Sequence, residues 1–210
     1  MKKYFTKDKM FYFRRTVTNP IDSFYEIRHR ELGSVPVALI CVFLFGFVFT
    51  MNRIFASFIV NEANPRTVNG LTEIGAVFLL FLLFCVGNWS ITCLMNGEGR
   101  LKDIMTVVGY SLTPLIAVYV PATLLSHVVA AGEEVFYTFA IALGIGWSAI
   151  LVLMGIMTVH NYSLLKTLLT LILTFLAMFV LIFLALLLFD LVNQVYIFLY
   201  SIYTELIFRY

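Results

Sequence analysis

The sequence predicts an all-α membrane protein, a polytopic bundle of five transmembrane helices with the N-terminus in the cytoplasm and the C-terminus outside. Hydrophobic residues make up 61% of the 210 residues and charged residues only 12%, whereas soluble domains carry about 25% charged residues. Several apolar stretches exceed the roughly 20 residues that a helix needs to cross a bilayer. Lysines and arginines also gather at one end of these stretches. A multi-pass membrane location follows, and no nucleic-acid partner is expected.

Residues 1–34 precede the first span and are predicted to form a basic and aromatic cytoplasmic segment. Between residues 2 and 15, basic side chains such as Lys7, Lys9 and Arg14 alternate with aromatic ones. A basic residue near anionic lipid headgroups contributes about 1 kcal/mol of attraction, so the segment is predicted to contact anionic headgroups of the bilayer. The positive-inside rule alone would also select these residues, and the two interpretations are compatible.

A short amphipathic helix is predicted inside this segment. Asn19 suits an N-cap, Pro20 suits the first helical position and Asp22 lies near the positive end of the helix dipole. The residues up to Leu32 place apolar side chains near one side and charged ones elsewhere. The helix is expected at the cytoplasmic surface, where it docks on lipid, on the bundle or on another protein.

The transmembrane domain is predicted over residues 35–194. Its first span covers about Val35 to Val60. Arg53 lies about 27 Å along this helix and is expected to reach the far interface. The second span covers about 71–94 and is followed by the turn Asn96–Gly99.

The third span is predicted at about Asp103 to Val128. It contains Pro114 and Pro121, which are expected to kink the helix and to free backbone carbonyls. The fourth span follows at about 135–159.

The fifth span, 164–189, is the most hydrophobic and is expected to end at Asp190, Asn193 and Gln194. Residues 195–210 mix tyrosines with charged side chains, a composition that suits an interfacial C-terminal tail. A tail that projects outward is the alternative.

Eleven of the 14 lysines and arginines fall on one side of the predicted spans, and the other three fall on the opposite side. Because positively charged flanks stay in the cytoplasm, the richer side is assigned to the cytoplasm. An odd number of spans then places the C-terminus outside. The eleven are Lys2, Lys3, Lys7, Lys9, Arg14, Arg15, Arg28, Arg30, Arg100, Lys102 and Lys166, and the three are Arg53, Arg66 and Arg209.

The sequence carries no motif of a membrane enzyme or an ATP-binding protein. It has neither an H-E-x-x-H zinc motif nor a G-x-x-x-x-G-K-[ST] phosphate loop. Glu73 and Asp190 are expected near the outer interface rather than deep in the membrane. Cys41, Cys85 and Cys93 lie in apolar stretches and are interpreted as packing residues. No catalytic residue, metal or cofactor is therefore predicted.

Polar residues of middle depth gather where spans two and three approach the second cytoplasmic turn. In lipid, such groups commonly form hydrogen bonds between helices that contribute about 0.6 to 2 kcal/mol each, and this packing role is the preferred interpretation. A pocket for a small ligand or a lipid headgroup is the alternative. The candidate pocket residues are Asn88, Trp89, Tyr110, Ser111 and Thr113.

Span four carries small residues at every fourth position, namely Ala140, Gly144 and Ser148. Such a stripe lets another helix approach closely. A helix of the same chain is the preferred partner, and a helix of another subunit is the alternative.

These features resemble the Yip1-domain family of five-span membrane proteins. The resemblance covers about residues 19–200 and depends on the order and spacing of several motifs. They are NPIDSFYEIR at 19–28, Asn88-Trp89, Asn96-Gly97, GYSLTP at 109–114, MGIMTVHNYS at 154–163 and Lys166-Thr167.

The resemblance implies a cytoplasmic N-terminus, an external C-terminus and no catalytic residues. Eukaryotic members act in Golgi and endoplasmic-reticulum traffic and bind Rab GTPases and one another through longer N-terminal regions. Only 34 residues precede the first span here, which is more similar to the bacterial branch. Through the bacterial members, the resemblance implies a role beside transport systems, including carbohydrate ABC importers.

The leading hypothesis is a non-catalytic protein of the bacterial plasma membrane that binds another membrane protein or further copies of itself. In this hypothesis it is an accessory or scaffold subunit of a transport system. The alternative is a small transporter, channel or lipid-handling protein with a pocket at the cytoplasmic ends of spans two and three.

Overall fold

The computed structural model describes the backbone of residues 7–61, 64–130 and 132–208 and the side chains from Tyr12 onward. Every regular element in these ranges is an α-helix. The helices are α1 (Lys7–Thr18), α2 (Pro20–Arg30), α3 (Val35–Phe55), α4 (Gly70–Leu94), α5 (Leu101–Ser111), α6 (Thr113–Leu125), α7 (Glu134–His160) and α8 (Leu164–Phe208). Lys2, Lys3, Arg209 and Tyr210, and the side chains of Lys7, Lys9 and Phe11, lie outside the described residues.

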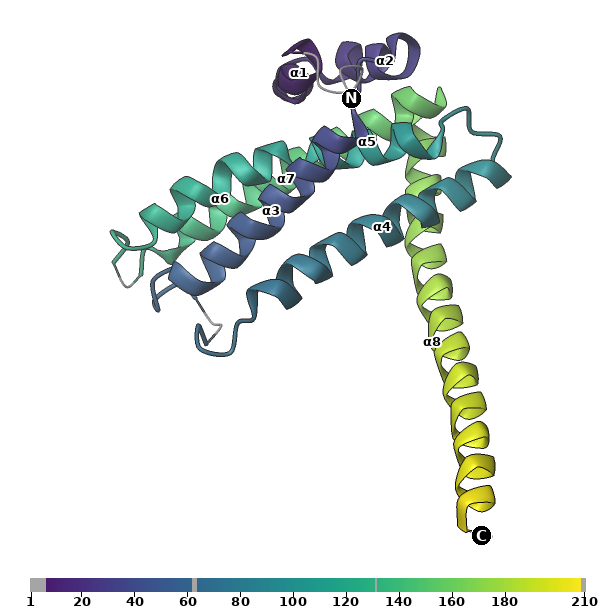
Figure 1. Cartoon of the computed structure of the whole chain (residues 1–210). Helices are drawn as coiled ribbons and strands as arrows, with labels where there is room; N and C mark the ends of the chain where they lie inside the picture. Colours follow the sequence, from purple (N-terminus) through teal and green to yellow (C-terminus); the bar gives the residue numbers. More distant parts are fainter. Residues whose placement is uncertain (1–6, 62–63, 131, 209–210) are drawn as a thin grey trace.

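Within the described residues, five helical segments are long and apolar enough to cross a membrane: α3, α4, α5 together with α6, α7 and α8. The predicted all-α bundle with five membrane helices is therefore confirmed. The helices α3, α6 and α7 pack together, and α4 packs along α3 (Figure 1). α8 packs on α4 near its own beginning and then leaves the bundle at a wide angle.

α1 and α2 lie across one end of the bundle, the end where α3 begins and α7 finishes (Figure 1). We name this the α2 end. It is the end that the distribution of lysines and arginines predicts to be cytoplasmic.

The third span consists of two helices, with Leu112 between α5 and α6. Pro114 stands in the first turn of α6 and has no backbone N–H to give to the carbonyl of Tyr110. The hydroxyl of Thr113 donates to that carbonyl instead, at 2.7 Å. A side chain thus satisfies the freed carbonyl, as is required inside a membrane. Pro121, the second predicted kink, lies within α6.

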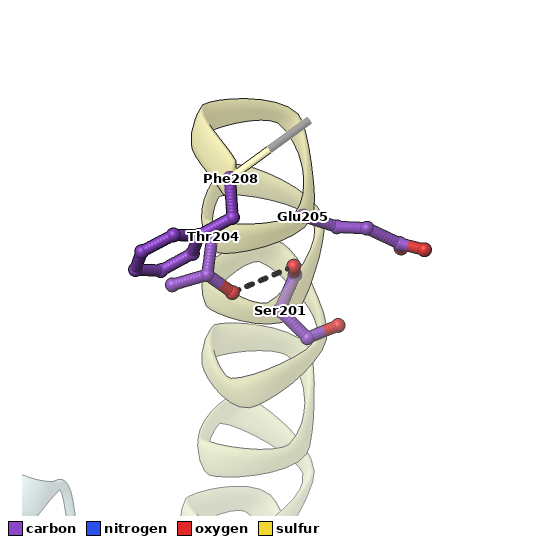
Figure 2. Close-up of a pocket in the computed structure, with 4 residues that line it drawn as sticks. All are labelled: Ser201, Thr204, Glu205 and Phe208. Atoms are coloured by element: carbon purple, nitrogen blue, oxygen red, sulfur yellow. Dashed lines mark hydrogen bonds between the residues drawn. The ribbon is translucent and has the colours of Figure 1, made fainter. Parts of the chain in front are cut away.

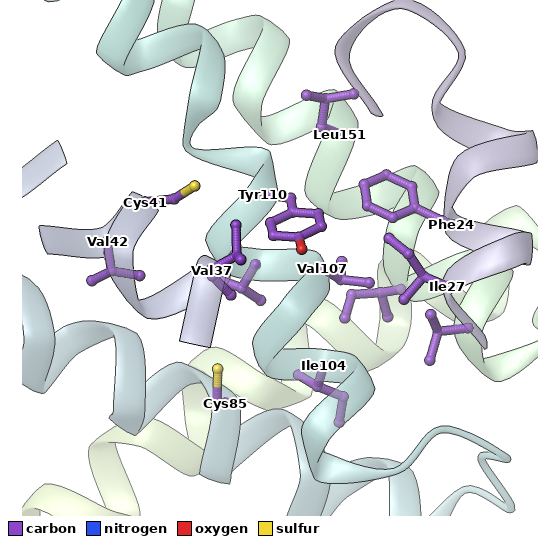
Figure 3. Packing of buried hydrophobic residues seen from close by; sticks show 14 of the residues in the cluster. Phe24, Ile27, Val37, Cys41, Val42, Cys85, Ile104, Val107, Tyr110 and Leu151 are labelled. Carbon is purple, nitrogen blue, oxygen red and sulfur yellow. The ribbon is translucent and has the colours of Figure 1, made fainter. Parts of the chain in front are cut away.

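The main apolar core lies near the α2 end, where α2 packs on α5 and α7. Phe24 is fully buried and Ile27 is 2% exposed, because the two side chains share the inner face of α2. Figure 3 shows them next to Val107 and Tyr110 of α5. Burial of one such side chain contributes about 1.5 to 3 kcal/mol. The inner face of α2 is therefore docked on the bundle, one of the three possibilities that the sequence left open.

α3 ends earlier than predicted, at Phe55 rather than Val60. The side-chain amide of Asn61 donates to the carbonyl of Arg53 at 2.8 Å, which folds the chain back on the helix end. The backbone N–H of Ser57 donates to the hydroxyl of Ser126 at 3.1 Å, which ties this turn to the end of α6.

α8 continues beyond the predicted end at Asp190 and runs without interruption to Phe208. One property of the sequence and one hydrogen bond explain this continuation of the helix. No glycine or proline occurs between Leu164 and Phe208, and the side chain of Gln194 donates to Asp190 one turn earlier at 2.8 Å. A polar residue at the surface of a helix does not end it.

Candidate functional site

The first feature of the candidate site is a hairpin of two helices, α1 and α2, which we name the N-terminal platform. Helix α1 was not predicted from the sequence. The hydroxyl of Tyr12 donates to the carboxylate of Glu26, and Arg15 pairs with the same carboxylate at 3.2 Å. Burial and the hydrogen bond with Glu26 raise the pKa of Tyr12 to about 12. The same hydrogen bond lowers the pKa of Glu26.

The platform also has an outer face. Ile21 and Tyr25 are each 53% exposed, and the ring of Tyr25 stacks on His29 with 4.0 Å between ring centroids. These three residues are spaced four apart, so they form one line along α2. We name Ile21, Tyr25 and His29 the outer stripe.

A cluster of ion pairs joins the platform to α5. The guanidinium of Arg28 lies 3.3 Å from the carboxylate of Asp103, and that of Arg100 lies 3.0 Å from it. The backbone N–H of Arg100 donates to the same carboxylate at 3.2 Å. The Asp103 side chain is only 5% exposed, and a buried carboxylate is costly without such donors. The hydrogen bond to Asp103 raises the pKa of Arg100.

A second, exposed pair lies beside this cluster. Lys102 donates to Glu31 at 2.9 Å, and Arg100 approaches the same carboxylate at 3.3 Å. The hydrogen bond from Lys102 lowers the pKa of Glu31. The Glu31 side chain is 57% exposed, so water and salt screen this pair strongly.

His160 joins the end of α7 to the turn between α4 and α5. Its ring is buried, and its Nδ1 accepts from the backbone N–H of Gly99 at 3.2 Å. This geometry places the proton of the neutral ring on Nε2, an atom to which no described residue bonds. The ring stacks on Tyr162, whose hydroxyl donates to the carbonyl of Met95 at 3.1 Å. Burial raises the pKa of Tyr162.

The candidate pocket residues are distributed over different contacts. The side-chain amide of Asn88 donates to the hydroxyl of Thr174 on α8 at 3.0 Å, whereas Trp89 is 42% exposed. The hydroxyl of Tyr110 accepts from the backbone N–H of Ser34 at 3.2 Å.

Two further candidates bond to the backbone of the third span. The hydroxyl of Ser111 donates to the carbonyl of Val107 at 2.8 Å, and Thr113 satisfies the carbonyl of Tyr110. Three cavities, at the distal part of α8, between α3, α4, α5 and α8, and between α6 and α7, are lined by none of the five candidate residues.

An apolar groove lies close to these residues, between α3, α4, α5 and α8. Its volume is about 260 Å³. Its lining includes Phe45, Phe81, Val108 and Met178. These residues lie in the interior of their spans, so the groove faces the middle of the membrane.

The small-residue stripe of span four lies partly against α6. A Cβ added at Gly144 would lie 3.2 Å from the side chain of Val118. Ala140 lines a cavity of about 370 Å³ beside Pro121 of α6. Ser148 is buried, and its hydroxyl has no partner among the described residues. The structure thus brings Gly144 and Ala140 next to a helix of the same chain.

Sequence reasoning missed a polar cluster at the end of the bundle opposite the α2 end. The side-chain amide of Asn52 donates to the hydroxyl of Thr123 at 2.8 Å, and the hydroxyl of Tyr137 donates to the Asn52 carbonyl oxygen at 2.9 Å. Arg53 and Glu73, both expected near this interface, pair at 2.6 Å.

The role of the ion pair between Arg28 and Asp103 was also missed. The available signal was Asp103 at the start of the predicted third span, because a carboxylate at that position needs a basic partner. In the described residues no group of three or more His, Cys, Asp or Glu side chains is placed to hold a metal ion.

The Yip1 domain matches residues 14–203 of this chain. A search of curated proteins and a search of solved structures returned no match. The match covers nearly the whole chain, and its five spans agree with the helices described above. The chain therefore belongs to the Yip1 family of membrane proteins.

Proposed function

We propose that this chain is a non-catalytic membrane protein of the bacterial plasma membrane that binds another membrane protein. In this proposal it is an accessory or scaffold subunit of a transport system, such as a carbohydrate ABC importer. The N-terminal platform is the proposed binding surface. One observation carries this choice: the inner face of α2 is buried in the chain's own bundle, while Ile21 and Tyr25 of the outer stripe are each 53% exposed.

The platform suits protein recognition because it is held in place before any partner arrives. Tyr12 and Arg15 fix α1 to Glu26 of α2, and Arg28 fixes α2 to Asp103 of α5. A surface ordered in advance loses less conformational entropy when it binds. Tyrosine is also among the residues that most often carry binding energy at interfaces.

Photo-crosslinking in native membranes tests this proposal. A photoreactive phenylalanine analogue replaces Tyr25, and the matched control carries the same analogue at Phe24 on the buried face of the same helix. We expect the residue 25 analogue to capture a second membrane protein, and the residue 24 analogue to react only within the chain. Reaction of the residue 25 analogue with lipid alone would contradict the proposal.

Anionic headgroups are a second proposed contact of the platform. Arg15 is 51% and Arg30 is 70% exposed at the side chain. Each basic residue near an anionic surface contributes about 1 kcal/mol. Amide exchange of α1 should be slower in vesicles containing phosphatidylserine than in neutral ones, and 0.5 M salt should remove the difference. Equal exchange in both kinds of vesicle would count against this contact.

A lipid-handling role is the second candidate function, and the apolar groove favours it. The groove, of about 260 Å³, is smaller than the roughly 420 Å³ that a single turn of helix about 10 Å across occupies. Its lining offers no polar partners for water. An acyl chain is both thin enough and apolar enough to occupy such a groove. Purified protein in liposomes would then scramble labelled lipids, and Phe81→Trp, which fills the groove, would slow this activity. Liposomes that scramble no faster than protein-free ones would exclude this role.

A further inference from the structure

One face of α8 is buried at the beginning of the helix. Thr167, Thr170 and Thr174 are fully buried, Leu171 packs against the apolar core, and Met178 lies 3.4 Å from the position of a Cβ added at Gly87 of α4. The intervals between Thr167, Leu171, Thr174 and Met178 alternate between four and three, and Thr170 lies beside this line. This is the spacing of a coiled-coil seam, in which every seventh residue repeats its position.

The same spacing continues after α4 has diverged from α8. From Ala185 onward the seam side chains are exposed, for example Val192 at 63% and Leu199 at 60%. We name this continuation the α8 seam. It consists of Leu181, Ala185, Leu188, Val192, Val195, Leu199, Ile202 and Leu206.

The polar residues in the distal part of α8 avoid the seam. At about 100° per residue, they fall within about one third of the helix circumference, on the side opposite the seam. Figure 2 shows Ser201, Thr204 and Glu205 along this polar side, with the hydroxyl of Thr204 donating to the carbonyl of Ser201 at 2.9 Å. The polar residues are Asp190, Asn193, Gln194, Ser201, Thr204 and Glu205.

α8 is too long for the hydrocarbon core of the bilayer to cover the whole α8 seam. Its 45 residues extend about 67 Å. Even at a steep tilt of about 40°, a helix crosses the roughly 30 Å hydrocarbon core within about 39 Å of its length. About 28 Å of helix, near the extent of residues 190–208, then lies outside the hydrocarbon core. That portion carries the apolar seam with a polar side opposite it.

We propose that the α8 seam is a self-association surface, on which the α8 helices of several copies of this chain pack in parallel. All copies share one orientation in the membrane, so their α8 helices run in the same direction. Parallel pairing places each seam residue beside its own counterpart. Asp190 and Glu205 lie on the polar side, so like charges do not meet in the seam.

The existing contact between α8 and α4 supports the α8 helix of a second copy as the partner of the α8 seam. The residues before Leu181 on the same face already pack against α4, and the seam extends that contact surface beyond the chain's own bundle. The residue types indicate the number of copies. The seam has two alternating positions, a and d of the heptad. Leu199 and Leu206 occupy position a, and the β-branched Val195 and Ile202 occupy position d. This arrangement favours three or four helices over two.

This surface is independent of the proposed partner contact at Tyr25, so either proposal can fail without the other. Disulfide crosslinking in native membranes tests it first. Cys93, the exposed cysteine, is replaced by alanine, and a single cysteine is then placed at Leu199 or, as the control on the same turn, at Ser201. We expect a disulfide-linked dimer from Leu199→Cys and at least ten-fold less from Ser201→Cys. Equal yields from both positions would overturn the proposal.

Native mass spectrometry of the full chain tests the number of copies. The wild type should appear as a trimer or tetramer. Leu199→Glu combined with Leu206→Glu should convert it to a monomer, whereas Ser201→Glu combined with Thr204→Glu should leave the oligomer unchanged. A monomeric wild type in which a spin label at Leu199 reports contact with lipid would overturn the proposal and place this segment at the interface instead.

Discussion

Gly109 of α5 lies directly against the backbone of Ala38 of α3. A Cβ added at Gly109 would lie 2.7 Å from the Cβ of Ala38 and 2.8 Å from its carbonyl oxygen. This close approach joins the first and third spans just before the third span is interrupted at Leu112. Small residues permit such approaches between membrane helices, where dispersion forces replace the hydrophobic effect as the attraction.

Substitution of Gly109 by alanine should therefore destabilise the bundle. The added methyl group meets backbone atoms that cannot rotate away, and overpacking of this kind costs about 1 to 3 kcal/mol. Unfolding in mixed micelles of increasing denaturing-detergent content measures the change. Gly146→Ala is the matched control, because nothing lies within 4 Å of a Cβ at Gly146, and it should be neutral or slightly stabilising. An equal loss for both variants would contradict the contact between Gly109 and Ala38.

Loss of the Asp103 carboxylate should release the platform from the bundle. Asp103→Asn leaves Arg28 and Arg100 without their shared anion, and disruption of a buried ion pair costs about 3 kcal/mol. Amide exchange of α2 should accelerate strongly. Glu31→Gln removes an exposed carboxylate from the neighbouring pair and should change α2 exchange very little. If the two variants behave alike, Asp103 does not hold the platform.

The hydroxyl of Thr113 should matter only while Pro114 is present. Thr113→Val removes the hydroxyl that donates to the Tyr110 carbonyl, which costs about 1 to 2 kcal/mol, whereas Thr113→Ser should be nearly neutral. Pro114→Ala restores a backbone N–H that can reach this carbonyl. In a double-mutant cycle, Thr113→Val should therefore cost much less in the Pro114→Ala background. Additive losses would show that the hydroxyl of Thr113 does not replace the N–H that Pro114 lacks.

The contact between Tyr12 and Glu26 should limit the pH range of an ordered platform. The folded pKa of Tyr12 is about 12 against an ordinary value of 10.0, so its contribution is complete below pH 10 and is lost as the pH rises toward 12. The pKa of Glu26 is lowered from 4.5, so its contribution is present above pH 4.5 and is lost as the pH falls further.

Spin-label mobility on α1 measures this dependence. A nitroxide at position 14, in the Cys93→Ala background, should become more mobile at both ends of the pH range. In Tyr12→Phe, the label should be more mobile at neutral pH and should show no further increase between about pH 10 and pH 12. An alkaline increase of the same size in both proteins would assign the change to another group.

Much of the fold could be predicted from sequence, because the membrane imposes long apolar helices with strong signals. The interruption of the third span was visible as Pro114, since proline removes a backbone donor wherever it stands. The continuation of α8 was not predicted, because Asp190 and Gln194 look like a helix end while they hydrogen-bond to each other within the helix.

The candidate site could be predicted only in part. The sequence identified Asn88 and Tyr110 as polar residues of the spans, but their partners, Thr174 and Ser34, are separated from them by 86 and 76 residues. Local periodicity carries no information about such distant pairs. For the same reason, the pairing of Arg28 with Asp103 became visible only in the folded chain.

The proposed partner contact depends on a cytoplasmic platform, and the parallel packing of α8 depends on one shared orientation of all copies. Single cysteines at Tyr25 on the platform and at Glu205 near the end of α8, in the Cys93→Ala background, are labelled in intact cells with a membrane-impermeant maleimide. We predict labelling at position 205 in intact cells, and labelling at position 25 only after the membrane is opened. Labelling of both positions in intact cells, or of neither, would place them on one face and contradict a five-span chain with a cytoplasmic platform.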